Sequence, residues 1–285
     1  MQSDDKRALL KLLESLLHSH RRHEVFEDFI TLADTYLRML PVHAESIATT
    51  GAPAKDDEET AAMFISVGKR YGDDYSVLAR AVTVLSCSAQ GDEEIADLVG
   101  EIYEEFGVSN AAHSQFFTPW DVTTMMARMA LEGYGMPLLV ERISAAVGPD
   151  VAGLFDLSAE RPETLRYVAE TLLPHSIDQF QPVTIADPAC GSGRFLLAAA
   201  RQFPRWVVRN GLVQLFGQDI DGLCVKMASV NMCLQGLNSW GLKYNRAGLI
   251  LLQSQAPTNP IEPLPVTPDF TLPPLELFGD IADAA

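Results

Sequence analysis

Residues 183–196 read VTIADPACGSGRFL, and this stretch decides the fold. The short apolar run from Val183 to Ala186 predicts a strand, and the helical spacing after Phe195 predicts a helix to Arg201. Between them, Gly191 and Gly193 predict a tight turn in which the backbone lies bare. Strand, glycine turn and helix in this order open an α/β unit, and a cofactor commonly lies against such a turn.

A second unit of the same kind follows, with 212–216 as strand, 217–221 as turn and 223–234 as helix, and 249–252 are expected to form a third strand. An acid ends each of the first two strands: Asp187 and Asp219. Asp187 could face a cationic amino-acid group and Asp219 could accept the two hydroxyls of a ribose. The alternative is that Asp187 only caps a helix and Asp219 only starts a turn.

The sequence before these units is predicted to be helical. Apolar residues at helical spacing predict two helices that end at Pro41, and further helices to about Phe106. Thr118 and Pro119 predict another helix start, with the hydroxyl as cap and the proline in the first turn. The methionines that follow at helical spacing are expected in the core. We therefore expect a helical region over 1–112, an α/β domain over 113–255 and a proline-rich tail over 256–285.

Composition limits the possible partners and locations. A formal net charge of −17 argues against a protein that coats nucleic acid unaided, so any DNA binding would be local or supplied by a partner. The four cysteines show no metal-ligand spacing, and we expect free thiols and no metal. No apolar run is long enough for a membrane span or a signal peptide, which favours a cytoplasmic location.

Three motifs together carry a family resemblance. The sequence DPACGSGRFL at 187–196 resembles the cofactor motif of N6-adenine DNA methyltransferases, close to type I restriction-modification methylase subunits and short plasmid or phage orphan forms. The sequence QFFTP at 115–119 resembles that group's other cofactor element, and GQDID at 217–221 resembles its ribose-binding turn. The resemblance implies a Rossmann-like S-adenosylmethionine-dependent methyltransferase sheet with an all-helical N-terminal region. It also implies methyl transfer to adenine N6 in DNA.

The resemblance further implies the residues of the cofactor site. By position, Phe117, Thr118, Asp187, Gly191 and Gly193 would hold the methionine moiety of S-adenosyl-L-methionine. Asp219 would hold the ribose and Ile220 the adenine face. The same motifs place three more residues at this site: Pro119, Pro188 and Ala189. The implied partners are DNA and a further protein, either a specificity subunit or a complementary methyltransferase part.

The sequence departs from the family at the catalytic element. That element is Asn or Asp followed by Pro, Pro and Tyr or Phe, and no such tetrapeptide occurs in the 285 residues. Asn259 and Pro260 are the candidate remnant, although Ile261 and Glu262 replace the second proline and the ring. The alternative is a turn in a proline-rich tail.

Several functions remain open at this point. The chain could be a non-catalytic cofactor-binding subunit of a split or multi-subunit enzyme, and cytosine N4 is a possible target instead of adenine N6. Cytosine C5 transfer is less favoured because there is no Pro-Cys dipeptide. A dinucleotide oxidoreductase is disfavoured because the turn lacks the Gly-x-Gly-x-x-Gly spacing.

Overall fold

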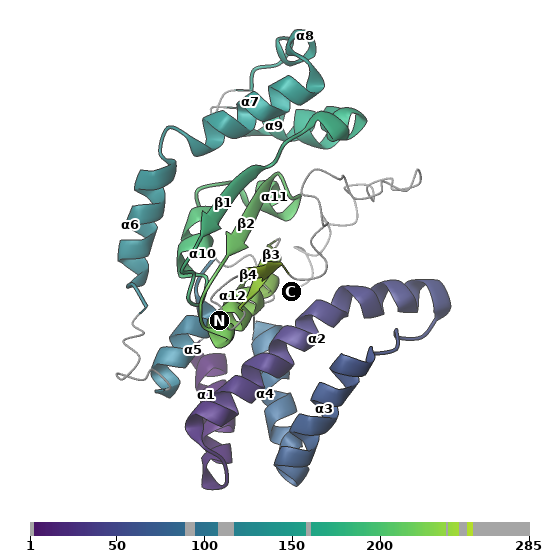
Figure 1. Cartoon of the computed structure of the whole chain (residues 1–285). Helices are drawn as coiled ribbons and strands as arrows, with labels where there is room; N and C mark the ends of the chain where they lie inside the picture. The colour runs from purple at the N-terminus through teal and green to yellow at the C-terminus, as the bar shows by residue number, and fades with distance from the viewer. Residues whose placement is uncertain are drawn as a thin grey trace. The chain divides into compact units, whose positions relative to one another are not determined.

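The computed structural model describes residues 3–88, 95–107, 117–157, 161–237, 239–244 and 250–252. All of these residues belong to one compact unit, Met1–Gln253. That unit is mostly helical and contains a small sheet (Figure 1). Within the described residues, no helix combines the length and apolar character needed to cross a membrane.

The N-terminal part is helical, as predicted. Its elements are α1 (Ser3–Ser15), η1 (Leu16–His18), α2 (Arg22–Thr50), α3 (Glu58–Tyr71), η2 (Gly72–Asp74), α4 (Tyr75–Ser88) and α5 (Leu98–Phe106). Asp57 caps α3 by accepting a hydrogen bond from the Thr60 N–H at 2.7 Å, and Asp97 caps α5 through Gly100. Apolar side chains such as Phe26, Phe29 and Ile102 are fully buried between these helices.

The predicted helix end at Pro41 is wrong. Helix α2 continues through Pro41 to Thr50, although a proline removes one backbone donor from a helix interior. The stop comes at Gly51, which adopts the left-handed conformation at φ 77° and donates its N–H to the Ile47 carbonyl at 2.9 Å. A glycine cap of this kind satisfies the last carbonyls of a helix, which Pro41 cannot do.

A second helical stretch leads to the sheet. It comprises α6 (Trp120–Leu131), α7 (Gly135–Val147), α8 (Pro149–Ala152), α9 (Pro162–Tyr167), the π-helical turn η4 (Val168–Leu172) and η5 (Leu173–Gln179). Helix α6 packs against α10, described below, through Ala127 and its neighbours. Its methionines were expected in the core, but Met125, Met126 and Met129 are 56%, 49% and 71% exposed. The small residues of α6 face the core instead, because they allow close helix approach.

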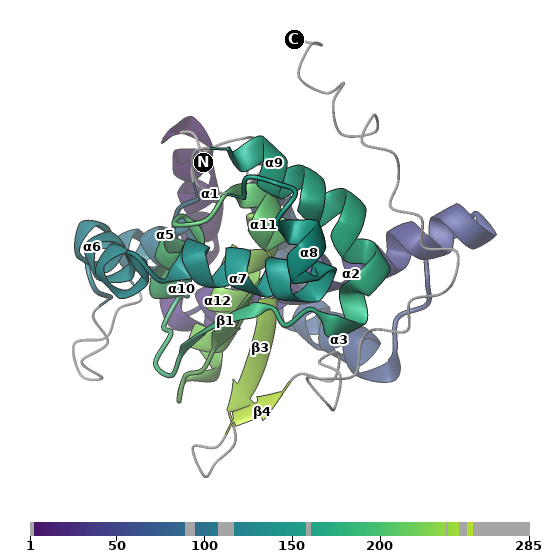
Figure 2. The same cartoon turned by 90° about the horizontal axis from the view of Figure 1, so that it is seen from above.

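The sheet and its helices complete the unit. They are β1 (Val183–Asp187), α10 (Arg194–Ala200), α11 (Arg205–Arg209), β2 (Val213–Gly217), α12 (Gly222–Leu234), β3 (Ser239–Tyr244) and β4 (Ile250–Leu252). The strand order is β1-β2-β3-β4, parallel from β1 to β3 and antiparallel between β3 and β4. Figure 2 shows β4 beside the end of β3. The segment predicted as the third strand is therefore the fourth, and β3 was missed because its alternating pattern is short and includes Gly241.

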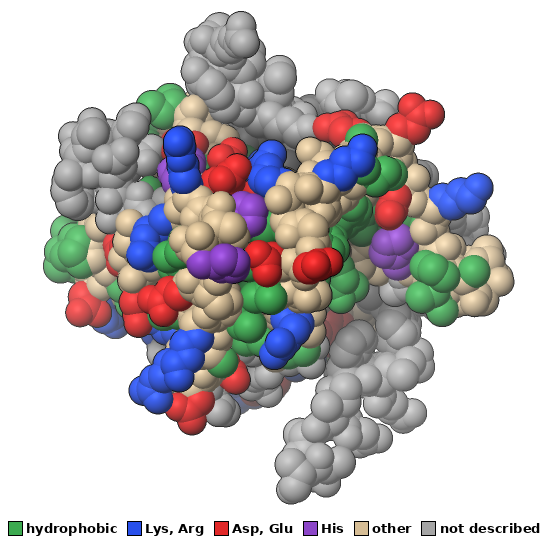
Figure 3. All heavy atoms as spheres, turned by 90° about the horizontal axis from the view of Figure 1, so that it is seen from below, with side chains coloured by type: hydrophobic (Ala, Val, Ile, Leu, Met, Phe, Trp, Pro, Cys, Tyr) green, Lys and Arg blue, Asp and Glu red, His purple; other side chains and the backbone are tan. Residues whose placement is uncertain are grey.

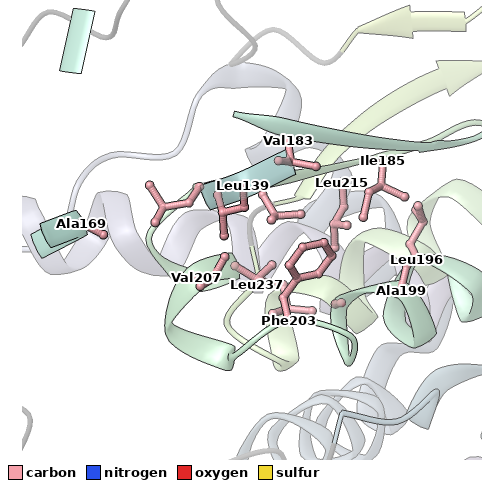
Figure 4. Close-up of a cluster of buried hydrophobic side chains, with 14 of the residues drawn as sticks. Leu139, Ala169, Val183, Ile185, Leu196, Ala199, Phe203, Val207, Leu215 and Leu237 are labelled. Atoms are coloured by element: carbon pink, nitrogen blue, oxygen red, sulfur yellow. The ribbon is translucent and has the colours of Figure 1, made fainter. Parts of the chain in front are cut away.

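Two hydrophobic clusters support these elements. One surrounds the sheet, where Val183, Ile185 and Leu215 meet Leu139 and Leu196 from helices and Phe203 from the turn after α10 (Figure 4). The other lies among the N-terminal helices and includes residues of α12. Helix α12 contributes Ala228 and Met232 to the first cluster and Leu223, Met227 and Val230 to the second. It is buried all round because it packs on both sides.

Candidate functional site

The ends of β1 and β2 are tied together by their backbones. The Gln218 N–H donates to the Asp187 carbonyl at 2.9 Å, and the Cys190 N–H donates to the Gln218 carbonyl at 2.7 Å. In the sheet register Asp187 lies opposite Gly217, so the two strands end at the same edge. The glycine turn after β1 and the acidic turn after β2 therefore form one continuous backbone surface.

Two half-buried carboxylates lie at this edge. The Asp219 Oδ2 accepts a hydrogen bond from the Gly191 N–H at 2.8 Å, and its Oδ1 accepts one from the Asp221 N–H at 3.0 Å. The Asp187 Oδ1 accepts from the Ala189 N–H at 3.0 Å. Burial raises the pKa of Asp187 above its ordinary value, the Ala189 hydrogen bond opposes this rise, and the Asp219 charge adds to it. The edge is thus suited to a ligand that carries positive charge.

Backbone conformation and packing both require glycine at two positions of the turn. Gly191 and Gly193 adopt φ values of 53° and 85°, where residues with a Cβ are strained. A Cβ at Gly191 would lie 2.8 Å from the Phe117 ring, and one at Gly193 would lie 3.1 Å from the Ala228 Cβ. The turn carries no side chain at these two positions because the Phe117 ring and helix α12 pack directly against its backbone.

The structure brings together five predicted site residues. Phe117 lies against Gly191 and Gly191 bonds Asp219, while Asp187 and Gly193 belong to the same turn. Five further predicted residues are exposed: Thr118, Pro119, Pro188, Ala189 and Ile220. The Ile220 side chain is 74% exposed and so is accessible to a ligand. Asn259 and Pro260 lie outside the described residues.

The predicted cap by Thr118 is wrong. Helix α6 begins at Trp120, its N-cap is Pro119, and no side chain caps it. Thr118 therefore lies one residue too early for its hydroxyl to reach the free backbone N–H groups of the first turn. Its carbonyl is used instead, because it accepts a hydrogen bond from the Arg194 Nη1 at 2.8 Å.

Sequence reasoning missed four buried polar residues behind the turn. Asp97, Ser192, Arg194 and Asn231 are 2%, 0%, 7% and 0% exposed and are joined by hydrogen bonds. The position of Asp97 before an apolar helix would have predicted its role as an N-cap. Its other partners lie 95 or more residues away along the chain, so no local pattern shows them.

The turn also contains a cysteine, which is not activated. Cys190 is 5% exposed, and burial, with further contributions from Asp219 and Asp187, raises its pKa to about 12. A thiol with so high a pKa carries almost no thiolate at neutral pH. Cys190 therefore has a packing role and is not a nucleophile.

Comparison with known proteins matches part of the chain to a family model and to curated relatives. The family model described as N-6 DNA Methylase matches residues 163–257, which include both strand ends and the glycine turn. Residues 163–257 are therefore similar in sequence to the N-6 DNA methylases. A protein of Methanocaldococcus jannaschii, whose name provisionally describes a type II restriction enzyme and methyltransferase, is 25% identical over 210 residues.

These matches confirm the resemblance and define its extent. The M. jannaschii alignment covers 64% of this chain but only 17% of that relative, so the chain spans a small part of its length. No solved structure matches the chain. The methylase match begins within α9 and covers β1 to β4, and therefore includes Asp187, Gly191 and Asp219.

Proposed function

We propose that the protein binds S-adenosylmethionine at the ends of β1 and β2 and takes part in methyl transfer to adenine N6 in DNA. One observation carries the proposal: the Gly191 N–H bonds the Asp219 carboxylate at 2.8 Å, within the region that matches N-6 DNA methylases. The acid and the glycine turn thus form one unit. The fold we propose is the Rossmann-like methyltransferase sheet, of which the parallel strands β1 to β3 would be one half.

The residues at this edge fit the chemistry of the cofactor. Asp187 would pair with the cofactor's ammonium group, because its burial beside another acid leaves its charge poorly solvated. Asp219 already accepts two backbone N–H groups and has lone pairs left for the ribose hydroxyls. The exposed Ile220 would cover the adenine, and Phe117 and Thr118 would lie beside the methionine end.

The cofactor would supply an electrophilic methyl group on a sulfonium centre. Methyl transfer would form a C–N bond to the adenine amine, break the C–S bond of the cofactor, and release S-adenosylhomocysteine and the amine proton. The amine is a poor nucleophile because its lone pair is conjugated into the purine, so acceptors must orient it. We propose the Asn259 side chain and the Pro260 carbonyl as these acceptors.

The charge of the helical region favours a partner for DNA binding. On the face in Figure 3, basic, acidic and histidine side chains are interspersed and form no broad basic surface among the described residues. Several basic groups of the N-terminal helices already pair with acids: Lys6 with Glu105 at 2.7 Å, and Arg70 with Asp28 at 2.6 Å. Phosphate binding requires clustered, available cations, so we propose that a specificity subunit or a complementary methyltransferase part supplies them.

Calorimetry tests cofactor binding directly. We expect S-adenosylmethionine and S-adenosylhomocysteine to bind the folded protein in a one-to-one ratio. The proposal is wrong if neither ligand gives detectable heat or competes with the other at millimolar concentration, while circular dichroism shows that the protein is folded.

A second function is favoured by the absent tetrapeptide: a cofactor-binding subunit that is inactive alone. The two are separated by incubating the protein with tritiated cofactor and unmethylated genomic DNA and then analysing the nucleosides. N6-methyladenine that disappears in Asn259→Ala supports the enzyme. Cofactor binding without any methylated nucleoside supports the function as a cofactor-binding subunit. N4-methylcytosine as the product would show that the target base is cytosine.

A further inference from the structure

Behind the cofactor turn, the Asp97 carboxylate is fully used by the protein. Its Oδ1 accepts hydrogen bonds from the Gly100 N–H at 2.8 Å and the Asn231 Nδ2 at 2.7 Å. Its Oδ2 accepts from the Ser192 hydroxyl at 2.7 Å and the Arg194 Nε at 2.6 Å. Four donors saturate a carboxylate, so Asp97 has no acceptor capacity left for a ligand. Its role must be exerted through these neighbours.

Arg194 extends this contact to the second cofactor element. Its Nη1 donates to the Thr118 carbonyl at 2.8 Å, and its guanidinium carbon lies 5.4 Å from the centre of the Phe117 ring. Burial alone would lower the pKa of Arg194, but the Asp97 charge and hydrogen bond, with Glu104, outweigh it and raise that pKa. The guanidinium thus stays charged and joins the segment at Phe117 to helix α10.

Asn231 of α12 closes the network at the glycine turn. Its Nδ2 donates to the Asp97 Oδ1 and to the Ser192 carbonyl at 2.8 Å, and its Oδ1 accepts from the Val99 N–H at 3.0 Å. Ser192 is therefore held at both its hydroxyl and its carbonyl, between the two glycines of the turn. A Cβ at Gly100 would collide with the Asp97 carboxylate, so the helix itself makes room for this arrangement.

A buried ion pair of this kind is weak evidence for stability, because desolvation offsets much of its attraction. A fixed geometry is the better-attested benefit. We propose that Asp97 and Arg194 are positioning residues, which hold the Phe117–Pro119 segment and the glycine turn in the arrangement that receives the methionine end of the cofactor. The proposal rests on the proposed function, and it assigns to helix α5 a part in cofactor binding without contact with the cofactor.

The matched test compares Asp97→Asn with Asp28→Asn. Asp28 is 6% exposed and accepts two hydrogen bonds from Arg70 at 2.8 and 2.6 Å, so it is a buried Asp–Arg pair among the N-terminal helices, away from the turn. Both variants remove one charge from such a pair. Only Asp97→Asn should weaken cofactor binding, although both variants should have lower thermal stability.

Two ligands make the test specific. S-adenosylhomocysteine carries the amino-acid end, whereas 5′-methylthioadenosine lacks it. Asp97→Asn should lower the affinity for S-adenosylhomocysteine by roughly tenfold or more, because fewer protein molecules would hold the turn in its binding conformation. A change of this size corresponds to the loss of one hydrogen bond to a charged group. The shorter ligand should change by less than about threefold, since it makes no use of the held segments. Equal weakening of both ligands, or equal effects of Asp28→Asn, would overturn the proposal.

Hydrogen exchange gives a readout that needs no ligand. In Asp97→Asn, the hydrogen-bonded amides of Cys190, Gly191 and Gly193, and that of Thr123, which bonds the Pro119 carbonyl, should exchange faster by roughly tenfold, while Asp28→Asn leaves them unchanged. Unchanged exchange rates in Asp97→Asn would refute the positioning role. Absence of ligand binding to the parent protein would instead refute only the proposed function. If Asp97→Asn does not fold, Arg194→Lys replaces it, because a lysine keeps the charge but cannot bridge Asp97 and the Thr118 carbonyl with a fork.

Discussion

Replacing Asp219 by asparagine should affect both the turn and the cofactor. Each Asp219 oxygen accepts one backbone N–H, from Gly191 at 2.8 Å and from Asp221 at 3.0 Å. An asparagine offers one oxygen and one NH₂ group, so one backbone N–H would face another donor. Loss of a hydrogen bond that involves a charged group costs about 1.5–3 kcal/mol. We expect the free energy of unfolding to fall by about that amount.

The effect on the cofactor should come in addition, because the ribose would lose its carboxylate acceptor. We expect S-adenosylhomocysteine to bind at least roughly tenfold more weakly to Asp219→Asn, as measured by calorimetry. Its 2′-deoxyribose analogue should lose much less. If the ratio of the two affinities is the same in the variant and the parent, the assignment of Asp219 to the ribose is wrong.

The control is Asp221→Asn, two residues away with the same change of charge. Asp221 caps helix α12 by accepting a hydrogen bond from the Leu223 N–H at 2.9 Å. Asparagine caps helices about as well as aspartate, so unfolding and cofactor affinity should change by less than about 0.5 kcal/mol. A loss equal to that of Asp219→Asn would mean that net charge, and not the two hydrogen bonds, explains the result.

Two further predictions concern the glycine turn and the acid before it. Gly191→Val should abolish cofactor binding, because the added Cβ would lie 2.8 Å from the Phe117 ring at a φ of 53°. The control Gly222→Ala should bind the cofactor normally, since its Cβ would meet nothing within 4 Å. If both variants bind the cofactor, the glycine turn is not required for binding. Cofactor affinity should fall as pH drops through the raised pKa of Asp187, because protonation removes its charge, and Asp187→Asn should bind weakly with no such pH dependence. Since the folded state holds this proton more tightly than the unfolded one, protonation also stabilises the fold, so thermal unfolding should show the opposite trend to binding.

The α/β unit could be predicted from sequence because its signals are local. The apolar run at Val183 and the glycines that follow indicate strand and turn within a dozen residues, and the structure places β1 and α10 there. Strand β3 was not predicted, because the alternation of Trp240, Leu242 and Tyr244 extends over only six residues and Gly241 within it lowers the strand propensity. Its place in the sheet depends on pairing with β2.

The site was predicted in part for the same reason. Asp187 and Asp219 follow strands, and the carboxyl ends of neighbouring parallel strands meet, so their proximity follows from the strand assignment. Asp97 and Asn231 carry no such local signal, because an Asp before a helix is usually only a cap and an Asn within a helix is usually exposed. What makes them a pair is the packing of α5 against α12.

The double role of α12 bears on how the helical region relates to the cofactor turn. One side of α12 packs on the sheet through Ala228 and Met232, and another packs among the N-terminal helices through Met227 and Val230. The four side chains are at most 6% exposed, so separating the two clusters would expose apolar surface on the very helix that follows the acidic turn. Asn231 lies between them and bonds both the Val99 N–H of α5 and the Ser192 carbonyl of the turn. Since one rigid helix carries both packing surfaces and this bridge, a displacement of α5 would reach the turn through hydrogen bonds and core packing at once. The N-terminal helices are therefore coupled to the glycine turn through α12.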